Sequence, residues 1–114
     1  MTVIDISPQE VESQKLSAQH LEAAVSAIET DGFVVLNDVV DVAHLDILRE
    51  KMLQDVQTLI NRPDAPFNWN PGNIQQDPPP FPPYLFRDVL LNDLVVEVTQ
   101  AIFCLLYTSD AADE

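Results

Sequence analysis

The sequence predicts an α+β fold, in which a helical N-terminal cap is combined with one or two short strands. Two stretches carry apolar side chains at helical spacing, and each begins directly after a residue that can cap a helix. A short apolar run rich in strand-forming residues lies between them and predicts a buried strand. The length of 114 residues fits one domain or part of one.

The first residues predict a strand followed by a short helix. Residues 2–6 alternate loosely between apolar and polar side chains, which fits a short edge strand. Ser7 can accept a hydrogen bond from the first helical turn, and Pro8 needs no backbone partner there. Glu10 completes a capping box, in which two side chains satisfy the open N–H groups of a helix start.

A second helix is predicted over roughly residues 18–30. Ser17 is a favourable N-cap, and Gly32 can adopt the left-handed conformation that ends a helix. The apolar residues at helical spacing are Leu21, Ala24, Val25 and Ile28. This helix leads into the predicted buried strand, Phe33–Leu36.

A longer helix is predicted after Asp41, which can serve as its N-cap. Its apolar face is formed by Leu45, Leu48, Met52, Val56, Leu59 and Ile60. Pro63 ends the helix, because the residue before a proline is kept out of the helical conformation. The order helix, strand, helix predicts that both helices pack on the one strand.

Residues 61–87 predict an ordered Pro-rich loop. They contain eight of the nine prolines and show no helical period. Five aromatic residues lie in or beside this run: Phe67, Trp69, Phe81, Tyr84 and Phe86. Disordered linkers are poor in aromatic residues, so we expect these side chains to be packed.

A last helix is predicted from Asp93 to about Phe103, with Asn92 as its N-cap. Its side chains are apolar nearly all round. We therefore expect this helix to be enclosed by other parts of the protein.

The charge balance is strongly acidic. The chain has 19 Asp and Glu against 5 Lys and Arg, a formal charge of -14. This argues against binding to nucleic acid or to anionic membranes, because both need clustered basic side chains. No secretory signal is visible, and no apolar stretch approaches the roughly 20 residues of a membrane span. We therefore expect a soluble, cytoplasmic protein.

The final residues, 104–114, read CLLYTSDAADE and resemble a translated sequencing adaptor. The codons of a transposase adaptor reproduce this stretch residue by residue. We interpret it as a non-native tail and exclude it from the fold. The one cysteine, Cys104, falls within this tail, so a disulfide framework is not expected.

Two histidines could suggest a metal site, but their spacing argues against one. His44 and Asp46 have the H-x-D form of two iron ligands. On a helix these positions lie about 200° apart, so they cannot hold one ion together. We interpret them as a solvated helix pair, and His20 as a surface residue of a first turn. Three carboxylates are interpreted as turn or cap residues: Asp64, Asp77 and Asp88. No catalytic or metal-binding residue is predicted in the chain.

The order of these pieces resembles the N-terminal region of the phytanoyl-CoA dioxygenase family. In that family a helix leads through DGFVVL into a first strand, as in LEAAVSAIETDGFVVL here. A helix of the form D…HL..LR..M follows, as in DVAHLDILREKM. The stretch FNWNPGNIQQDPPPFPPYLFRDVL is similar to a fungal-type subgroup. The resemblance covers nearly all of residues 1–103.

The resemblance implies a double-stranded β-helix, or jelly-roll, core that binds Fe(II) and 2-oxoglutarate and hydroxylates a small organic substrate. In the family, two histidines and an aspartate hold the iron, and they follow the region matched here. The chain is then an N-terminal fragment that is itself inactive and binds neither cofactor. The segment before the last helix passes the active-site mouth in the family. Five residues there are candidates for contacts near cofactor or substrate: Trp69, Asn73, Gln75, Gln76 and Arg87.

An alternative from another class of function is a small acidic helical module that docks to partners through PPPFPPY, residues 78–84. The run contains P-x-x-P and can form a polyproline helix, the form that SH3 and WW domains bind. It lacks the PPxY form that WW domains recognise, and its nearest basic residue, Arg87, lies several positions away.

Overall fold

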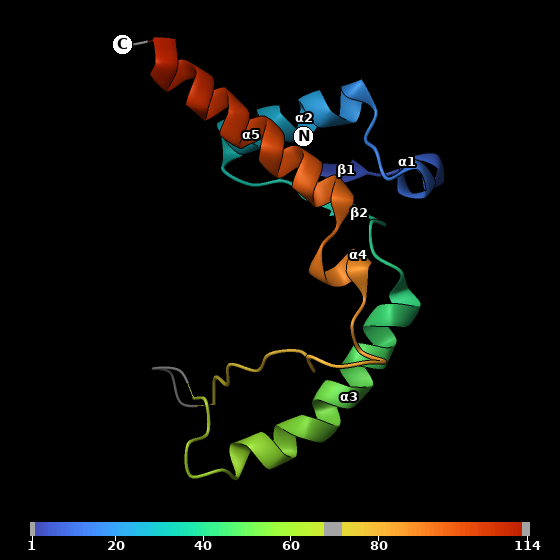
Figure 1. Cartoon of the computed structure of the whole chain (residues 1–114), viewed down its shortest axis with the longest axis vertical. Helices are drawn as coiled ribbons and strands as arrows, with labels where there is room; N and C mark the ends of the chain where they lie inside the picture. Colours follow the sequence, from blue (N-terminus) through green and yellow to red (C-terminus); the bar gives the residue numbers. More distant parts are fainter. Residues whose placement is uncertain (1, 68–71, 113–114) are drawn as a thin grey trace. The chain divides into compact units, whose positions relative to one another are not determined.

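The computed structural model describes residues 2–67 and 72–112, with side chains up to Cys104. Within these residues there are five helices and two strands (Figure 1). In chain order they are β1 (Val3–Asp5), α1 (Pro8–Ser13), α2 (Ala18–Asp31), β2 (Val35–Asn37), α3 (Val42–Ile60), α4 (Arg87–Leu90) and α5 (Asp93–Ala112). The mixture of helix and strand confirms the α+β class.

The chain divides into two compact units. The first contains Met1–Val40 and Leu91–Glu114, and the second contains Asp41–Leu90. In the first unit α2 packs against α5 and β1, whereas α3 belongs to the second unit. Whether α3 also packs on the strand stays a prediction, because α3 belongs to the other unit. Beside α2 lies α5, which contributes the buried apolar residues Leu94 and Val98.

The predicted helix starts in the first unit are confirmed. Ser7 caps α1 and forms both halves of the capping box with Glu10. Ser17 caps α2 by accepting a hydrogen bond from the backbone N–H of His20. Gly32 ends α2 with φ of 82°, a left-handed conformation that side chains with a Cβ rarely adopt.

The two strands form a parallel pair. Val3 lies opposite Val35, Ile4 opposite Leu36, and Asp5 opposite Asn37. Because parallel strands cannot be joined by a tight turn, α1 and α2 form the connection between them. Successive side chains point to opposite faces of the sheet, so Ile4 is buried while Val3 is 44% exposed.

The core of the first unit lies where the sheet meets α2 and α5. Its buried residues are Ile4, Ile6, Leu16, Ala24, Leu94 and Val98. Half-buried apolar residues surround them, among them Val34, Leu36 and Ile102. The small side chain of Ala24, which is fully buried, allows α5 to approach α2 closely.

The strand predicted at Phe33–Leu36 is shifted and only half buried. β2 begins at Val35, and its inward residue Leu36 packs against the core. Phe33 is 57% exposed and Val35 is 42% exposed. A run of four apolar residues indicated burial on both faces, but in this unit the sheet is covered on one face only.

The last helix differs from its prediction in two ways. α5 continues through Cys104 to Ala112, beyond the predicted end at Phe103. No proline or glycine interrupts these residues, so nothing in their composition stops a helix. The helix is also not enclosed: Val95 is 46% exposed and Phe103 is 65% exposed. Its predicted N-cap is confirmed, because the Asn92 side chain accepts from the N–H of Leu94 at 3.1 Å.

The second unit consists of α3, the Pro-rich segment and the short α4, which the sequence did not indicate. Asp41 caps α3 as predicted, accepting from the Ala43 N–H at 2.9 Å. Among the described residues of this unit, only Leu48 and Pro79 are buried. The unit therefore has little apolar core of its own.

Within the described ranges, no helix has the length and apolar character that crossing a membrane requires.

Candidate functional site

The described part of the second unit contains an open groove between α3 and the Pro-rich segment. Its volume is about 750 Å³, which is in the range of small-molecule sites. From α3 it is lined by Asp55, Thr58, Leu59 and Arg62. From the Pro-rich segment and α4 it is lined by Gln76, Asp77, Pro78, Pro79, Pro80, Phe81, Leu85 and Leu90.

Local chemistry explains how the Pro-rich segment is held along α3. The side-chain amide of Gln76 donates to the backbone carbonyl of Met52 in α3, at 3.1 Å. The three prolines that follow have no N–H group to satisfy, so this wall of the groove presents mainly apolar rings. Pro79 is buried, while the rim residues Phe81 and Leu85 are each 49% exposed.

Two of the charged groups of the groove already have partners. Arg62 donates to both oxygens of Asp64, from Nε at 3.0 Å and from Nη2 at 2.6 Å. The hydrogen bond from Arg62 lowers the pKa of the Asp64 carboxyl. Lys51 lies 2.6 Å from Asp55, and this hydrogen bond raises the pKa of the Lys51 ammonium.

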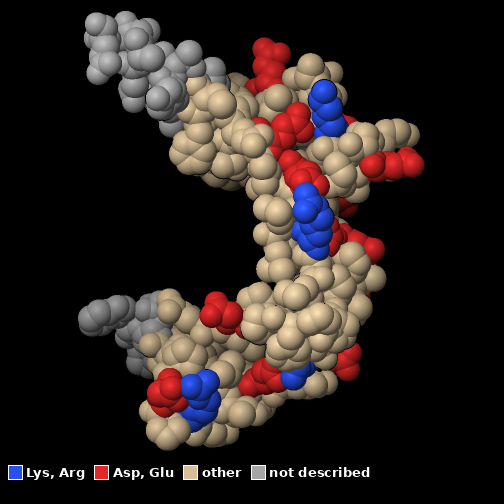
Figure 2. All heavy atoms as spheres, in the orientation of Figure 1, with Lys and Arg blue, Asp and Glu red and all other residues tan. Residues whose placement is uncertain are grey.

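Asp77 differs from these groups. Its carboxylate lines the groove and is exposed, and it has no hydrogen-bond or ion-pair partner in the described part of the chain. Basic side chains are few and lie scattered among acidic ones on the face in Figure 2. The groove thus combines apolar walls with one carboxylate whose charge is not compensated.

A second cluster joins the first turn of α3 to α4. His44 Nδ1 lies 2.8 Å from an oxygen of Asp88, whose other oxygen accepts from the backbone N–H of Asp41 at 2.9 Å. The His44 ring also stacks on Phe86, with the ring centres 4.2 Å apart. The interpretation of His44 as solvated is therefore wrong, although Asp46 on the same helix is exposed.

The electrostatics of Asp88 follow from these contacts. Burial raises the pKa of its carboxyl, but hydrogen bonds from Asp41 and His44 outweigh burial and leave the pKa below its usual value. The prediction of a simple turn or cap role for Asp88 missed this contact. His44 and Asp88 lie 44 positions apart, a separation at which sequence spacing gives no signal.

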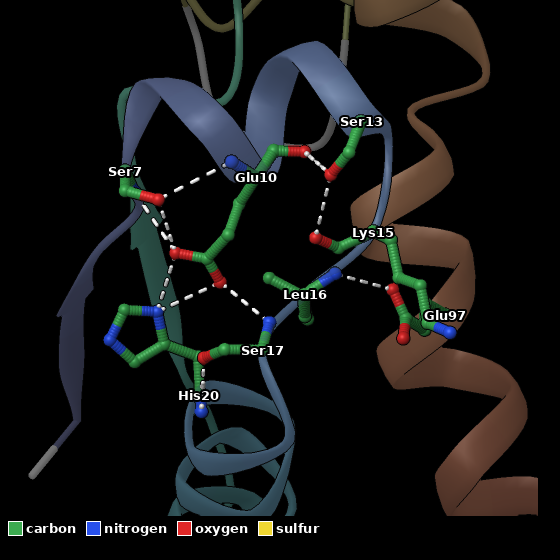
Figure 3. Close-up of polar contacts among 8 residues, drawn as sticks. All are labelled: Ser7, Glu10, Ser13, Lys15, Leu16, Ser17, His20 and Glu97. Atoms are coloured by element: carbon green, nitrogen blue, oxygen red, sulfur yellow. Dashed lines mark hydrogen bonds and ion pairs between the residues drawn. The ribbon is translucent and has the colours of Figure 1, made fainter.

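A third cluster surrounds Glu10 in the first unit (Figure 3). Its Oε1 accepts from the N–H of Ser7 at 3.1 Å and from the Ser7 hydroxyl at 2.8 Å. Its Oε2 accepts from the N–H of Ser17 at 2.8 Å, and His20 Nδ1 lies 2.9 Å from Oε1. His20 lies in the first turn of α2, as predicted, with its side chain 30% exposed, and its ring is also a partner of this buried carboxylate.

These bonds stabilise the ionised form of Glu10. The hydrogen bond from Ser17, aided by those from Ser7 and His20, lowers the pKa of Glu10 from 4.5 to about 2 despite its burial. Nearby, the N–H of Leu16 donates to Glu97 of α5 at 2.9 Å. Both carboxylates hold the connection between α1 and α2 in place, so this cluster is structural.

The family resemblance places the iron ligands in sequence that follows the matched region, and the described residues supply no other ligand set. Within the described ranges, no three His, Cys, Asp or Glu side chains lie where they could hold one metal ion. His44 and Asp46 both lie on α3, and the Nδ1 atom of His44 is occupied by Asp88. No step of an iron-dependent reaction can be assigned to the described residues.

Of the five residues predicted near cofactor or substrate, four lie in the described part of the chain, and one of these lines the groove. Gln76 lines the groove. Asn73 and Gln75 are exposed and are not among its lining residues, and Arg87 is exposed at the start of α4. Trp69 lies outside the described residues. Whether any of them contacts a substrate stays a prediction.

Asp77 was missed as a site residue, although it stands directly after Gln76 and before the proline run. Its position gave a signal, because a carboxylate beside an extended apolar segment has few local partners. No model of a known protein family matches the chain.

Proposed function

We propose that the chain is the N-terminal part of an Fe(II)- and 2-oxoglutarate-dependent dioxygenase that resembles the phytanoyl-CoA dioxygenase family. In this proposal the parent enzyme has a jelly-roll core and hydroxylates a small organic substrate. Residues 1–103 contribute a helical cap and one side of the substrate path, but no metal ligand and no catalytic residue.

The observation that carries the proposal is the set of large apolar side chains that remain exposed in the first unit. A two-stranded sheet is too small to be stable alone and commonly forms part of a larger sheet. Here Phe33 and Val35 of the β2 region, and Val95 and Phe103 of α5, expose apolar area beside a well-packed core. This is the arrangement expected if further strands of a larger core covered these residues.

The chemistry is divided between the cofactors and the protein. Bound Fe(II) and 2-oxoglutarate supply the oxidising chemistry in enzymes of this type. The described residues supply an apolar groove, which can exclude water and orient a substrate. The basic residue for 2-oxoglutarate and the iron ligands are expected in sequence that follows Phe103.

The alternative, a docking module that uses PPPFPPY, has weaker support. Pro79 is buried and residues 78–81 line one wall of the groove, although Pro80, Phe81, Pro82 and Pro83 are exposed. Phe81 and Tyr84 also contact each other edge to face, with ring centres 5.7 Å apart. A panel of SH3 and WW domains is expected not to bind the chain, and saturable binding to one of them would favour the alternative.

Sequencing the source transcript through the codon of Phe103 is the first test. We expect the codons of residues 104–114 to be absent and the frame to continue into an H-x-D motif and a later histidine. A genuine stop codon directly after Glu114 would overturn the proposal.

The longer chain then gives the biochemical test. It is expected to decarboxylate 2-oxoglutarate only when Fe(II) is added. Replacing the first histidine of the downstream motif with alanine should abolish this turnover. Turnover that persists in this variant would contradict the proposed iron site.

A further inference from the structure

We propose that the groove of the second unit binds an apolar organic molecule that carries one ammonium group. The inference deepens the proposed function, because it names the substrate class of the parent enzyme. Its binding step needs only the described residues, so it can be tested separately from catalysis.

The size and lining of the groove favour a small molecule. A volume of about 750 Å³ holds a drug-sized compound. The prolines, Leu59, Leu85 and Leu90 offer apolar area on both sides, and half-exposed leucines gain from being covered. The body of the ligand is therefore expected to be hydrocarbon or aromatic.

The sign of the ligand charge follows from the groups that remain available. The guanidinium of Arg62 already holds both oxygens of Asp64, and the carboxylate of Asp55 is paired with Lys51. Asp77 is the lining carboxylate without a partner in the described residues. An anionic ligand would meet this charge unfavourably, whereas a cationic ligand would compensate it.

Phe81 adds a second feature that favours an ammonium group. Its ring lines the groove and is 49% exposed, so a face or edge is accessible to a ligand. Aromatic rings attract ammonium groups through their quadrupole, and the attraction is larger when water is displaced. A carboxylate and an aromatic ring at one apolar groove together favour an ammonium ion over a neutral polar group.

The test compares three probes with one carbon skeleton: a phenylalkylammonium, the corresponding alcohol and the corresponding carboxylate. Binding to the 114-residue chain is followed by NMR titration near neutral pH, at about 0.15 M salt so that long-range attraction to the acidic surface is screened. The ammonium probe is expected to bind about three- to fivefold more tightly than the alcohol, and the carboxylate most weakly. Equal affinity for all three probes would overturn the inference.

Variants locate the effect within the groove. Asp77→Asn and Phe81→Leu should each reduce the preference for ammonium while binding of the alcohol is retained. Asp46→Asn is the matched control, because it removes the same charge from an exposed position of α3 outside the groove. An equal loss in Asp46→Asn and Asp77→Asn would mean that only the net charge attracts the probe, which contradicts the inference.

Thr58→Phe tests the site itself. Thr58 is an exposed lining residue, so the larger ring should fill the groove without disturbing a core. Binding of both the ammonium and the alcohol should be lost, and binding that persists would place the probe elsewhere. Far-UV circular dichroism of each variant checks that the helices are retained.

The two proposals can fail separately. If the probes show no preference but the longer chain decarboxylates 2-oxoglutarate, the ammonium inference is wrong and the oxygenase proposal stands. If the preference depends on Asp77 but the transcript ends after Glu114, the groove remains a binding site and the oxygenase proposal falls.

Discussion

The two units of this chain differ in the interactions that stabilise each of them internally. The first unit has an apolar core that includes the fully buried Leu94. Its buried carboxylate, Glu10, accepts hydrogen bonds at both oxygens. In the described part of the second unit only Leu48 and Pro79 are buried, and the other side chains are partly or fully exposed. The burial of apolar side chains provides most of the stability of a folded protein. We therefore expect the first unit to have the higher free energy of unfolding and the second unit to open more easily.

The pairs His20–Glu10 and His44–Asp88 show the same contrast on a smaller scale. The side chains of His20 and Glu10 are 30% and 10% exposed, whereas those of His44 and Asp88 are 34% and 26% exposed. Hydrogen bonds to a buried carboxylate are screened little by water, whereas hydrogen bonds to a partly exposed carboxylate compete with hydrogen bonds from water. Similar geometry therefore has a larger effect on stability in the first unit.

The largest effect is expected from Leu94→Ala. This change removes a fully buried side chain from the core of the first unit and leaves a cavity, which should lower the free energy of unfolding by about 2–5 kcal/mol. Leu59→Ala in the second unit is the matched control. Leu59 is only half buried, so about 1 kcal/mol is expected there. Urea denaturation measures both, and equal losses would break the comparison between the units.

Acidification should weaken the first unit through Glu10. Because folding lowers the pKa of Glu10 from 4.5 to about 2, its contribution to stability is present above pH 4.5. This contribution is lost as the pH falls toward about 2, and its upper limit is about 3 kcal/mol. Glu10→Gln should flatten the pH dependence of the unfolding free energy in this range, as measured by urea denaturation at several pH values.

Glu12→Gln is the control for this titration, since Glu12 is an exposed residue of the same helix. It should leave the pH dependence unchanged. A pH dependence that survives in Glu10→Gln would show that other carboxylates cause the acid sensitivity.

Asp88→Asn should have a smaller effect, confined to the second unit. The asparagine keeps one acceptor for the Asp41 N–H but loses the charged contact with His44. About 1 kcal/mol is expected, because the pair is partly exposed. Amide hydrogen exchange should become faster in the first turn of α3 and in α4. Equally faster exchange in α2 would contradict a local role.

The sequence predicted the local features of the fold and missed those that depend on distant residues. The caps Ser7, Ser17, Asp41 and Asn92 were predicted because a cap needs only its next few neighbours. The assignment of α3 to a separate unit was not, because helical spacing shows that a face is apolar but not which element covers it.

The candidate site was predictable only in part, for the same reason. The segment that contains Gln76 was identified, and Gln76 does line the groove. Asp77 becomes prominent only when Arg62 and Lys51 are seen to be paired with other carboxylates. His44 and Phe86 show the same limit, since their stacking joins α3 to the far end of the Pro-rich segment.

The smallest effect is expected for Arg62→Ala at the rim of the groove. In its ion pair with Asp64 both side chains are exposed, that of Arg62 by 49% and that of Asp64 by 72%. Water and salt screen such a pair, so the urea midpoint should not change measurably. The variant also removes the positive charge from the groove lining, so the ammonium probe should bind slightly more tightly. A clear loss of stability together with weaker ammonium binding would show that this salt bridge shapes the groove, and that the second unit is more rigid than its small core indicates.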